Sequence, residues 1–320
     1  MNKIKSRLIH LYRCRYIGRS TLKKLFLIDP TLQSIYDWDT LAWRSHLNFS
    51  LKQSIAIQED LKSPLLIEEV QRDQKNYNVI TILDNNYPAT LYNIPDPPLV
   101  LYLKGNPQLL THNSLSIIGT RFPSKFALPI MRKLIPPLVE NNLTIVSGMA
   151  RGVDGLAHEI TMKTGGNTIA IIASGINYVY PPEHKELCTQ LEMDHLVISE
   201  YSPNTPPRRF QFPERNRLIS GLSFGTLIIE AKERSGSLIT VEQALDQGRE
   251  VFAVPGALHM ETSKGCNRMI QEGATLVQNS LDILLEWESR KYSWEQFLIE
   301  SDTERKRKVK DLFDKMQESI

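Results

Sequence analysis

Short, almost continuously apolar runs recur between about residue 112 and residue 254, and they limit the possible folds more than any other feature of this chain. The segments between these runs have the spacing of helices. Strands that are apolar on both faces are typical of a parallel sheet covered by helices on both sides. The sequence therefore predicts an α/β fold with a doubly wound, mostly parallel sheet. The predicted strands are 115–119, 143–147, 168–173, 196–198, 226–229 and 250–254.

Glycine and proline mark the helices that are predicted between these strands. Helices are expected at 154–163 and 238–247, because glycine, which accepts the left-handed conformation of a helix end, follows each of them. Pro129, Pro136 and Pro137 follow the first strand. We expect them to shorten or kink the helix there, because proline lacks a backbone N–H.

Residues 1–75 have helical spacing without strand alternation, and they predict a small all-α domain in front of the sheet. Ile4, Leu8 and Leu11 show this spacing. The turn at 16–21 resembles a SAM or helix-hairpin-helix module, which would present backbone amides to a phosphate. A simple pair of packed helices is the alternative interpretation.

Three further segments complete the predicted organisation. Residues 76–111 are rich in proline, and we interpret them as an extended linker that packs on the main domain. Residues 112–288 form the main domain. Residues 289–320 are predicted to be a charged tail, either a solvated helix or a frayed extension, with a basic run at 305–308.

The composition limits the classes of function. The 320 residues include 38 Lys plus Arg and 36 Asp plus Glu, a net charge of +2, so any nucleic-acid site must be local. The three cysteines are far apart and predict neither a zinc site nor disulfides. The basic N-terminus lacks an apolar signal segment, and no run approaches the length of a membrane span. We therefore expect a cytoplasmic protein without membrane contact.

Loops rich in glycine, hydroxyl groups and arginine follow several predicted strands. In open parallel sheets, ligands bind beyond the carboxyl ends of the strands, where helix N-termini direct N–H groups at anions. Glycine lets the backbone approach a phosphate, and arginine supplies a fork of donors. The sequence thus predicts a phosphate site built from 119–121, 147–154, 173–175, 212–223 and 235–237.

The sequence motifs of common enzymes are absent. There is no GxGxxG dinucleotide loop, no Walker A lysine loop and no GxSxG elbow. Asp154 and His158 lie one turn apart on the predicted helix 154–163. We interpret them as a carboxylate at the helix N-terminus and a histidine bonded between helix and sheet. No catalytic residue, metal site or cofactor is therefore predicted.

The ordered series of motifs resembles the DNA processing protein DprA (Smf) family over nearly all of residues 112–288. The matching pieces are Ile118–Arg121, Ser147–His158, Tyr180-Pro181, Ser199-Glu200, Phe212–Leu222, Arg234–Thr240, Gly248–Gly256 and Gly265–Asn267. The resemblance implies a Rossmann-like domain that binds single-stranded DNA, a homodimer, and no enzymatic activity. It further implies a recombination mediator that protects incoming DNA and helps load the RecA recombinase during natural transformation (competence).

The resemblance also implies site residues. The family's phosphate-binding arginine falls on Arg121, and its basic residue after the Tyr-Pro motif falls on Lys185. Arginine forks hold phosphates without reading sequence, and aromatic faces such as Phe210 or Tyr180 can stack bases. The full predicted DNA- and phosphate-binding set is Gly119, Thr120, Arg121, Ser147, Gly148, Arg151, Gly175, Lys185, Phe210, Arg215, Asn216, Arg217, Ser235, Gly236 and Ser237.

The chain departs from the family pattern in three ways. Asn177 stands where aspartate is common and His184 where asparagine is common, so the loop 175–185 is expected to contact DNA differently. Many relatives carry a C-terminal winged-helix domain, and the residues beyond 288 are too few for one.

Two other functions stay open from the sequence alone. A nucleotide phosphoribohydrolase of the lysine-decarboxylase-like type has a Pro-Gly-Gly-x-Gly-Thr loop near this place. Here the corresponding loop lacks the paired glycines, and only Glu242 could match that family's acid. A protein-interaction scaffold for a recombinase would bind a partner and no DNA. Single residues also have structural interpretations: Asn216 could bridge two loops, and Arg217 could pair with Glu230 or Glu233.

Overall fold

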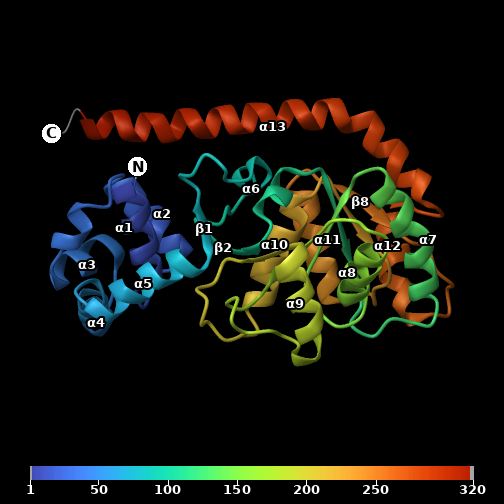
Figure 1. Cartoon of the computed structure of the whole chain (residues 1–320), viewed down its shortest axis with the longest axis horizontal. Coiled ribbons are helices and arrows are strands. Elements are labelled where there is room, and N and C mark those ends of the chain that lie inside the picture. The colour runs from blue at the N-terminus through green and yellow to red at the C-terminus, as the bar shows by residue number, and fades with distance from the viewer. Residues whose placement is uncertain (1, 318–320) are drawn as a thin grey trace. The chain divides into compact units, whose positions relative to one another are not determined.

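The structure is a computed structural model that describes residues 2–317 (Figure 1). Residue 1 and the end of the predicted tail, residues 318–320, lie outside this range. The chain divides into two compact units. Unit 1 contains the residues up to 87, residues 98–101 and the residues from 302 on, whereas unit 2 contains residues 88–97 and 102–301. The four segments expected from the sequence stay a prediction.

Unit 1 begins with five helices, which confirms the predicted helical start of the chain. They are α1 (Asn2–Arg13), α2 (Arg19–Ile28), α3 (Thr40–Leu47), α4 (Leu51–Leu61) and α5 (Pro64–Asn76), with a 3-10 turn η1 (Ser34–Asp37). Local sequence signals start three of them, and Asp39 caps α3 by accepting a hydrogen bond from the Ala42 N–H. Ser50 and Gln53 form a capping box at α4, and Ser63 caps α5, which begins with proline. The apolar stripes of the helices are buried, Leu8 and Leu11 completely.

One nine-stranded sheet forms the framework of the fold. In space the strands lie in the order β1-β2-β6-β5-β4-β3-β7-β8-β9. All neighbours from β6 to β9 are parallel, and β2 pairs antiparallel with β6. This confirms the predicted doubly wound, mostly parallel sheet. The strands are β1 (Asn78–Thr81), β2 (Val100–Gly105), β3 (Ser114–Ile118), β4 (Thr144–Ser147), β5 (Thr168–Ile172), β6 (Leu196–Ser199), β7 (Gly225–Ile228), β8 (Glu250–Ala253) and β9 (Thr275–Leu276).

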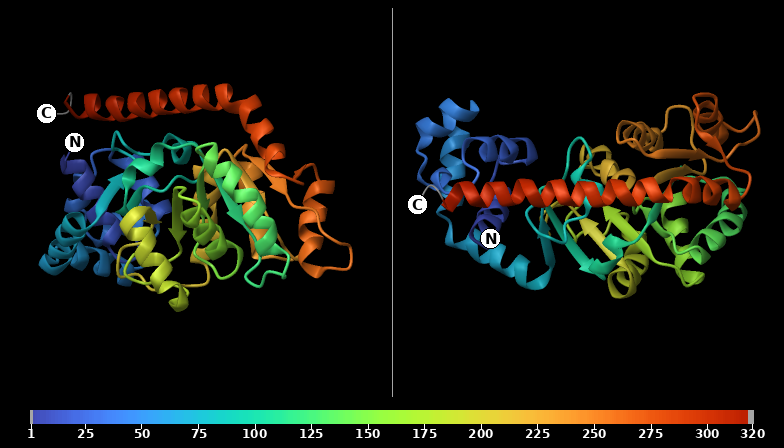
Figure 2. Two further views of the ribbon diagram at one scale, coloured as in Figure 1. Left: turned by 45° about the vertical axis from the view of Figure 1, so that its right-hand side comes forward. Right: turned by 90° about the horizontal axis from the view of Figure 1, so that it is seen from above.

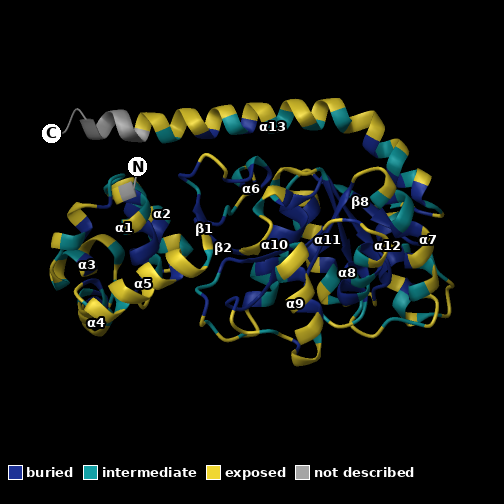
Figure 3. Cartoon of the chain, viewed as in Figure 1, coloured by how far each residue is buried: buried dark blue, intermediate teal, exposed yellow. Residues whose placement is uncertain are grey.

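Helices cover both faces of the sheet in unit 2 (Figure 2). They are α6 (Ala89–Tyr92), α7 (Ala127–Glu140), α8 (Val153–Lys163), α9 (Lys185–Asp194), α10 (Gln211–Leu222), α11 (Gly236–Asp246), α12 (Lys264–Gln271) and α13 (Ser280–Gln317), with 3-10 turns η2 (Pro107–Thr111), η3 (Pro182–His184) and η4 (Glu261–Ser263). Helices α7 and α8 and the start of α13 share one core with β3, β4 and β7. Buried residues fill the centre of the unit (Figure 3).

The chain order reverses between β3 and β7. From β3 the chain winds outward through β4, β5 and β6, and it then returns to the other side of β3 as β7 and continues to β8 and β9. Such a reversal is a topological switch point, and it leaves a crevice beyond the carboxyl ends of the two central strands. The loops after β3 and β7 therefore lie beside each other.

Helix α7 differs from the sequence expectation, because its prolines do not shorten it. The helix runs for 14 residues with Pro136 and Pro137 inside it. Pro129 stands in the first turn, where a missing N–H costs no intrahelical bond. The buried face that includes Met131 and Leu134 packs into the core of unit 2. Tertiary packing therefore outweighs the local cost of the two internal prolines.

The segment interpreted as a proline-rich linker contains two strands that the sequence did not predict. Residues 102–105 of β2 pair with β6 and extend the main sheet by an antiparallel strand. The signal is the apolar run 99–103, which directly follows two prolines. Because proline is tolerated at a strand start but not in its middle, this run can form an edge-type strand.

The C-terminal helix is not a wholly solvated tail. Arg305, part of the basic run, is fully buried in unit 1. Its guanidinium donates hydrogen bonds to the backbone carbonyls of Asp84 and Asn85 and pairs with Asp302. In unit 2, the Arg249 guanidinium lies over two aromatic rings of the same helix, Trp294 and Phe297. The distances from Arg249 Cζ to the ring centres are 4.7 and 5.3 Å. The interpretation of the basic run as solvent-facing is therefore wrong for Arg305.

Candidate functional site

A cavity lies at the switch point, beyond the carboxyl ends of β3 and β7. Its volume is about 470 Å³, which is within the usual range of ligand pockets. Four segments far apart in the sequence form its walls: 118–122 at the end of β3, 150–154 around the start of α8, 212–219 on α10, and 232–240 around the start of α11. The topology of the sheet thus brings these loops to one place.

The cavity is lined by an excess of positive charge. Arg121, Lys232 and Arg234 are exposed, and none of them makes an ion pair or a side-chain hydrogen bond within residues 2–317. Arg121 lies over the Phe212 ring, 5.6 Å from its centre. Asp154 is the only acid among the lining residues. Cations that the protein itself does not neutralise favour an anionic ligand.

Arg215 of α10 is a further cation, and it is buried in the wall of the cavity, with 5% of its surface exposed. Its Nη1 donates to the Ile171 carbonyl and its Nε to Asn216 Oδ1, whereas Nη2 makes no hydrogen bond in the described part of the chain. Burial lowers the pKa of Arg215, and burial raises the pKa of the neighbouring Asp154. Nη2 is not sealed from the cavity, so this donor of a largely buried guanidinium is available to a ligand that supplies an acceptor.

A smaller apolar cavity of about 110 Å³ adjoins the first. The two share Arg121, Phe122 and Arg215, and the smaller one adds Tyr180. The Tyr180 and Phe212 rings meet edge to face, 5.6 Å apart between centres. A phosphate held by the arginines would thus have aromatic surfaces beside it, on which a base could stack.

The start of α11 closes the other side of the larger cavity. Ser235 caps the helix by accepting a hydrogen bond from the Ser237 N–H (3.3 Å). Ser237 Oγ donates to the Gly119 carbonyl at 2.8 Å and so joins the loop after β7 to the loop after β3. The N-terminus of an 11-residue helix therefore faces a cavity that is already positive.

The structure brings together nine of the fifteen residues that the sequence predicts for the site. The predicted residues that line one or both cavities are Gly119, Thr120, Arg121, Arg151, Arg215, Asn216, Ser235, Gly236 and Ser237. Arg151 is also ion-paired with Glu183, which offsets its charge. Asn216 Oδ1 accepts a hydrogen bond from Nε of Arg215, its neighbour on α10, so this bond does not bridge two loops.

Three of the other predicted residues are packed inside the protein. Ser147 is buried, and its hydroxyl donates to the Ile117 carbonyl at 2.6 Å. Asp154 and Arg215 fill the space beside the Gly148 Cα, so that a methyl group there would collide with both. Gly175 lies against the backbone carbonyls of 202 and 203, which leaves no room for a side chain. These residues shape the walls rather than face the ligand space.

Lys185 and Phe210 are exposed but line neither cavity. Lys185 is the first residue of α9, and Phe210 precedes α10 with 55% of its surface exposed. Both could meet a long ligand only outside the cavities.

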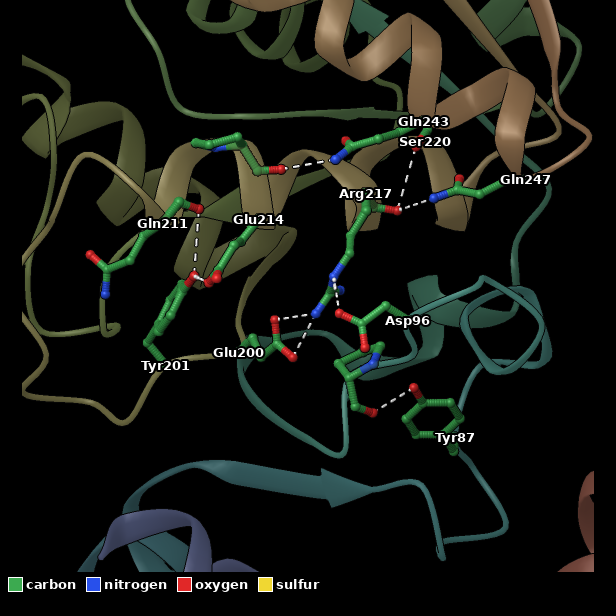
Figure 4. A network of polar contacts seen from close by, with 12 residues as sticks. Tyr87, Asp96, Glu200, Tyr201, Gln211, Glu214, Arg217, Ser220, Gln243 and Gln247 are labelled. Carbon is green, nitrogen blue, oxygen red and sulfur yellow. Dashed lines mark hydrogen bonds and ion pairs between the residues drawn. The ribbon is translucent and has the colours of Figure 1, made fainter. Parts of the chain in front are cut away.

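Arg217 points away from the site, contrary to the expectation that it lines the pocket with Arg215. Two residues along a helix are about 200° apart around its axis, so Arg215 and Arg217 of α10 cannot face the same way. Arg217 Nη2 donates to both Glu200 oxygens at 2.7 and 2.6 Å, and Nε lies 3.5 Å from Asp96 (Figure 4). Pairing with Glu230 or Glu233 is therefore also wrong.

Glu230, just after β7, has a structural role. It is buried and accepts hydrogen bonds from the Ser124 N–H (2.8 Å) and the Ser124 hydroxyl. These bonds hold the loop after β3, which carries Arg121, against the end of β7.

The lining residues that the predicted site set missed include one exposed aromatic residue and two cations, Phe122, Lys232 and Arg234. Phe122 has 77% of its surface exposed, which is unusual for a large apolar side chain. The signal for the two cations was their position directly after a buried strand, where a parallel sheet binds ligands.

His158 has the structural role expected from the sequence. Its Nδ1 shares a hydrogen bond with Thr168 Oγ1 at 2.6 Å, and Nε2 with the Gly148 carbonyl at 2.7 Å. The ring is fully buried, and this burial lowers its pKa to about 4. His158 therefore joins α8 to β5 and to the loop after β4 as a neutral residue.

The pKa of His158 predicts an acid-sensitive fold. In the unfolded chain a histidine titrates near pH 6.5, so below about pH 6.5 the unfolded state binds a proton that the native state does not bind until about pH 4. The contribution of His158 is thus complete above about pH 6.5, and about 3 kcal/mol is lost as the pH falls toward 4. Asp154, with its raised pKa, acts in the opposite direction.

Urea denaturation at about pH 7.5 and about pH 4.5 would measure this loss. His158→Gln should remove most of this loss, so that its free energy of unfolding changes less between the two pH values than that of the native chain. Replacement of the exposed His259 by glutamine should not have this effect. Equal pH dependence in the native chain and His158→Gln would contradict the prediction.

Over the described residues, none of the helices combines the length and the apolar character that a bilayer span requires. Within the same range, histidine, cysteine and acidic side chains are nowhere grouped so that they could hold a metal ion.

A doubly wound, mostly parallel sheet with a cationic cavity at its switch point defines a Rossmann-like protein. A family model for DNA recombination-mediator protein A matches residues 78–288. Since this match covers more than half of the chain, the chain belongs to the DprA/Smf family of DNA recombination-mediator proteins.

Individual relatives agree with this assignment. DNA processing protein DprA of Streptococcus pneumoniae is 44% identical over 219 residues, which are 68% of this chain and 77% of that protein. DprA of Bacillus subtilis is 36% identical over 280 residues, 82% of this chain and 92% of that protein.

Solved structures of two relatives have the same fold. An X-ray structure of S. pneumoniae DprA matches with a TM-score of 0.66 and 37% identity, covering 84% of this chain and 98% of that chain. A structure of DprA from Helicobacter pylori, described for its single-stranded DNA binding mode, matches with a TM-score of 0.60 and 29% identity, covering 67% and 96%.

The family is one of recombination mediators and not of enzymes. The phosphoribohydrolase alternative therefore fails. Its one candidate acid, Glu242, is exposed on α11 and lines neither cavity.

Proposed function

We propose that this chain binds single-stranded DNA at the switch-point cavity and acts as a recombination mediator. The observation that carries this proposal is the group of unpaired cations, Arg121, Lys232 and Arg234, around a cavity with the free Nη2 of Arg215 in its wall. The H. pylori relative, described for its single-stranded DNA binding mode, supports the choice of ligand.

The geometry favours single strands over duplex DNA. Bases of a single strand are free to leave the stack, and Phe122, Tyr180 and Phe212 offer aromatic surfaces next to the cations. In a duplex the bases are already paired and stacked, so the aromatic surfaces would add little binding free energy. Arginine contacts to phosphate carry no sequence information, and binding should therefore be independent of sequence.

Site residues have distinct roles in this proposal. Arg121 and Arg215 hold a phosphate, with Asn216 orienting the Arg215 fork. The loop with Gly119 and Thr120 and the start of α11 with Ser235, Gly236 and Ser237 add backbone and hydroxyl donors. Arg151, Lys185 and Phe210 contact the strand outside the larger cavity.

The partners implied by the family resemblance are part of the same proposal. The protein forms a homodimer, loads RecA on single-stranded DNA during natural transformation, and works in the cytoplasm. The match at 36% identity over 92% of B. subtilis DprA supports carrying the partners that the family resemblance implies over to this chain.

The test is a fluorescence-anisotropy titration of labelled oligo-dT and of a matched duplex over a salt series. We expect the single strand to bind more tightly, with affinity that falls linearly in log–log form as salt rises, because binding releases counterions from the phosphates. Oligo-dT and a mixed-sequence strand should bind alike. Partner capture without any DNA affinity at low salt would overturn the proposal in favour of a protein-interaction scaffold.

A further inference from the structure

The larger cavity holds more positive charge than one internal DNA phosphate can use. Four cationic side chains, Arg121, Arg215, Lys232 and Arg234, line it against one carboxylate, Asp154. That carboxylate already accepts a hydrogen bond from the Ala150 N–H at 3.2 Å. An internal phosphodiester carries one charge and offers two free oxygens. A terminal phosphomonoester carries nearly two charges and offers three acceptor oxygens.

The donors are arranged around the cavity and not along one side of it. Arg121 stands on the loop after β3, Arg215 on α10, and Lys232 and Arg234 on the loop after β7. Nothing lies within 4 Å of the position where a side chain would grow from Gly236, at the start of α11. A ligand oxygen can therefore approach this helix start closely.

Arg215 provides the independent indication of a ligand. Only 5% of its surface is exposed, and the residue lines both cavities. Nη2 of its guanidinium has no hydrogen-bond partner in the described part of the chain. The adjoining apolar cavity, with Tyr180 and Phe212, lies where the sugar and base attached to the bound phosphate would reach. The two cavities together thus match one terminal nucleotide.

We propose that the switch-point cavity recognises a terminal phosphomonoester, at the phosphorylated end of a DNA strand, in preference to an internal phosphodiester. This inference rests on the proposed binding of single-stranded DNA. The same chemistry occurs in a free nucleoside monophosphate, so the experiment separates the two sources.

The experiment is a competition against labelled oligo-dT by short unlabelled strands that differ only at their ends: a 5′-phosphate, a 3′-phosphate, or hydroxyls at both ends. Thymidine monophosphate is the fourth competitor. We expect one of the phosphorylated strands to compete about tenfold better than the hydroxyl-ended strand, because charge-assisted hydrogen bonds to the extra oxygen are added. Weaker competition by thymidine monophosphate identifies the strand end as the ligand, and equal competition identifies the free nucleotide.

Variants locate the effect in the cavity. Arg234→Ala and Lys232→Ala should each bring the ratio between phosphorylated and hydroxyl-ended strands close to one, while hydroxyl-ended strands still bind, more weakly. Lys125→Ala is the matched control, because Lys125 is exposed in the loop after β3 but does not line the cavity. It should leave the ratio unchanged.

Equal competition by phosphorylated and hydroxyl-ended strands would overturn the inference and leave the proposed DNA binding intact, since the cavity would then take internal phosphates. A ratio close to one between phosphorylated and hydroxyl-ended strands in Lys125→Ala, as well as in Arg234→Ala, would also overturn it. Failure of every strand to bind the native protein would instead remove the proposed function.

Discussion

Replacement of Arg121 by alanine is expected to weaken the binding of oligo-dT by about tenfold to a hundredfold at low salt. Arg121 is exposed, has no ion pair in residues 2–317 and lines both cavities. A charge-assisted hydrogen bond contributes about 1.5–3 kcal/mol, which corresponds to this range of affinity. The loss should be similar for every sequence, and the salt slope should fall by about one unit, because one phosphate contact disappears.

Two matched variants show whether the effect belongs to the site. Arg121→Lys should bind with intermediate affinity, because lysine keeps the charge but lacks the planar fork. Arg132→Ala removes an exposed arginine of α7 that lines neither cavity, and should bind like the native chain. Anisotropy titrations at several salt concentrations measure all three. Equal losses in Arg121→Ala and Arg132→Ala would mean that binding depends only on total charge.

Arg217→Met is expected to lower the free energy of unfolding by about 3–5 kcal/mol. The substitution removes a partner of Glu200, whose side chain is 1% exposed, and takes two hydrogen bonds from Arg217 Nη2 away from this buried carboxylate. Urea denaturation at neutral pH measures the loss. The double variant Arg217→Met with Glu200→Met should recover much of it, because replacing a whole buried pair by apolar side chains is often nearly neutral.

An exposed pair provides the control for this prediction. Arg268 and Glu272 lie one turn apart on the surface at 2.7 Å, and Arg268→Met should cost less than about 1 kcal/mol. Folded Arg217→Met should retain native affinity for oligo-dT, because Arg217 lies outside both cavities. A stable Arg217→Met variant that fails to bind DNA would mean that Arg217 contributes to the DNA site, contrary to its position outside both cavities.

The difference between Arg215 and Arg217 shows where sequence reasoning stops. Both belong to the motif that carries the family resemblance, and both were predicted to line one pocket. The outcome depends on 211–222 being helical, which places residues two apart on opposite sides. It depends also on Glu200 and Asp96, acids from distant segments that capture Arg217.

The sequence by itself determined the order and type of the main elements, because strands buried on both faces must be apolar throughout. It also determined the edge of the sheet where Gly119, Thr120 and Arg121 stand, since parallel strands all end on the same side. Only the tertiary structure decided which polar side chains face the ligand space. Ser147 turned to the Ile117 carbonyl, Arg305 became buried, and Lys232 and Arg234 joined the cavity. Such choices depend on partners brought close by folding, and the local sequence holds no record of those partners.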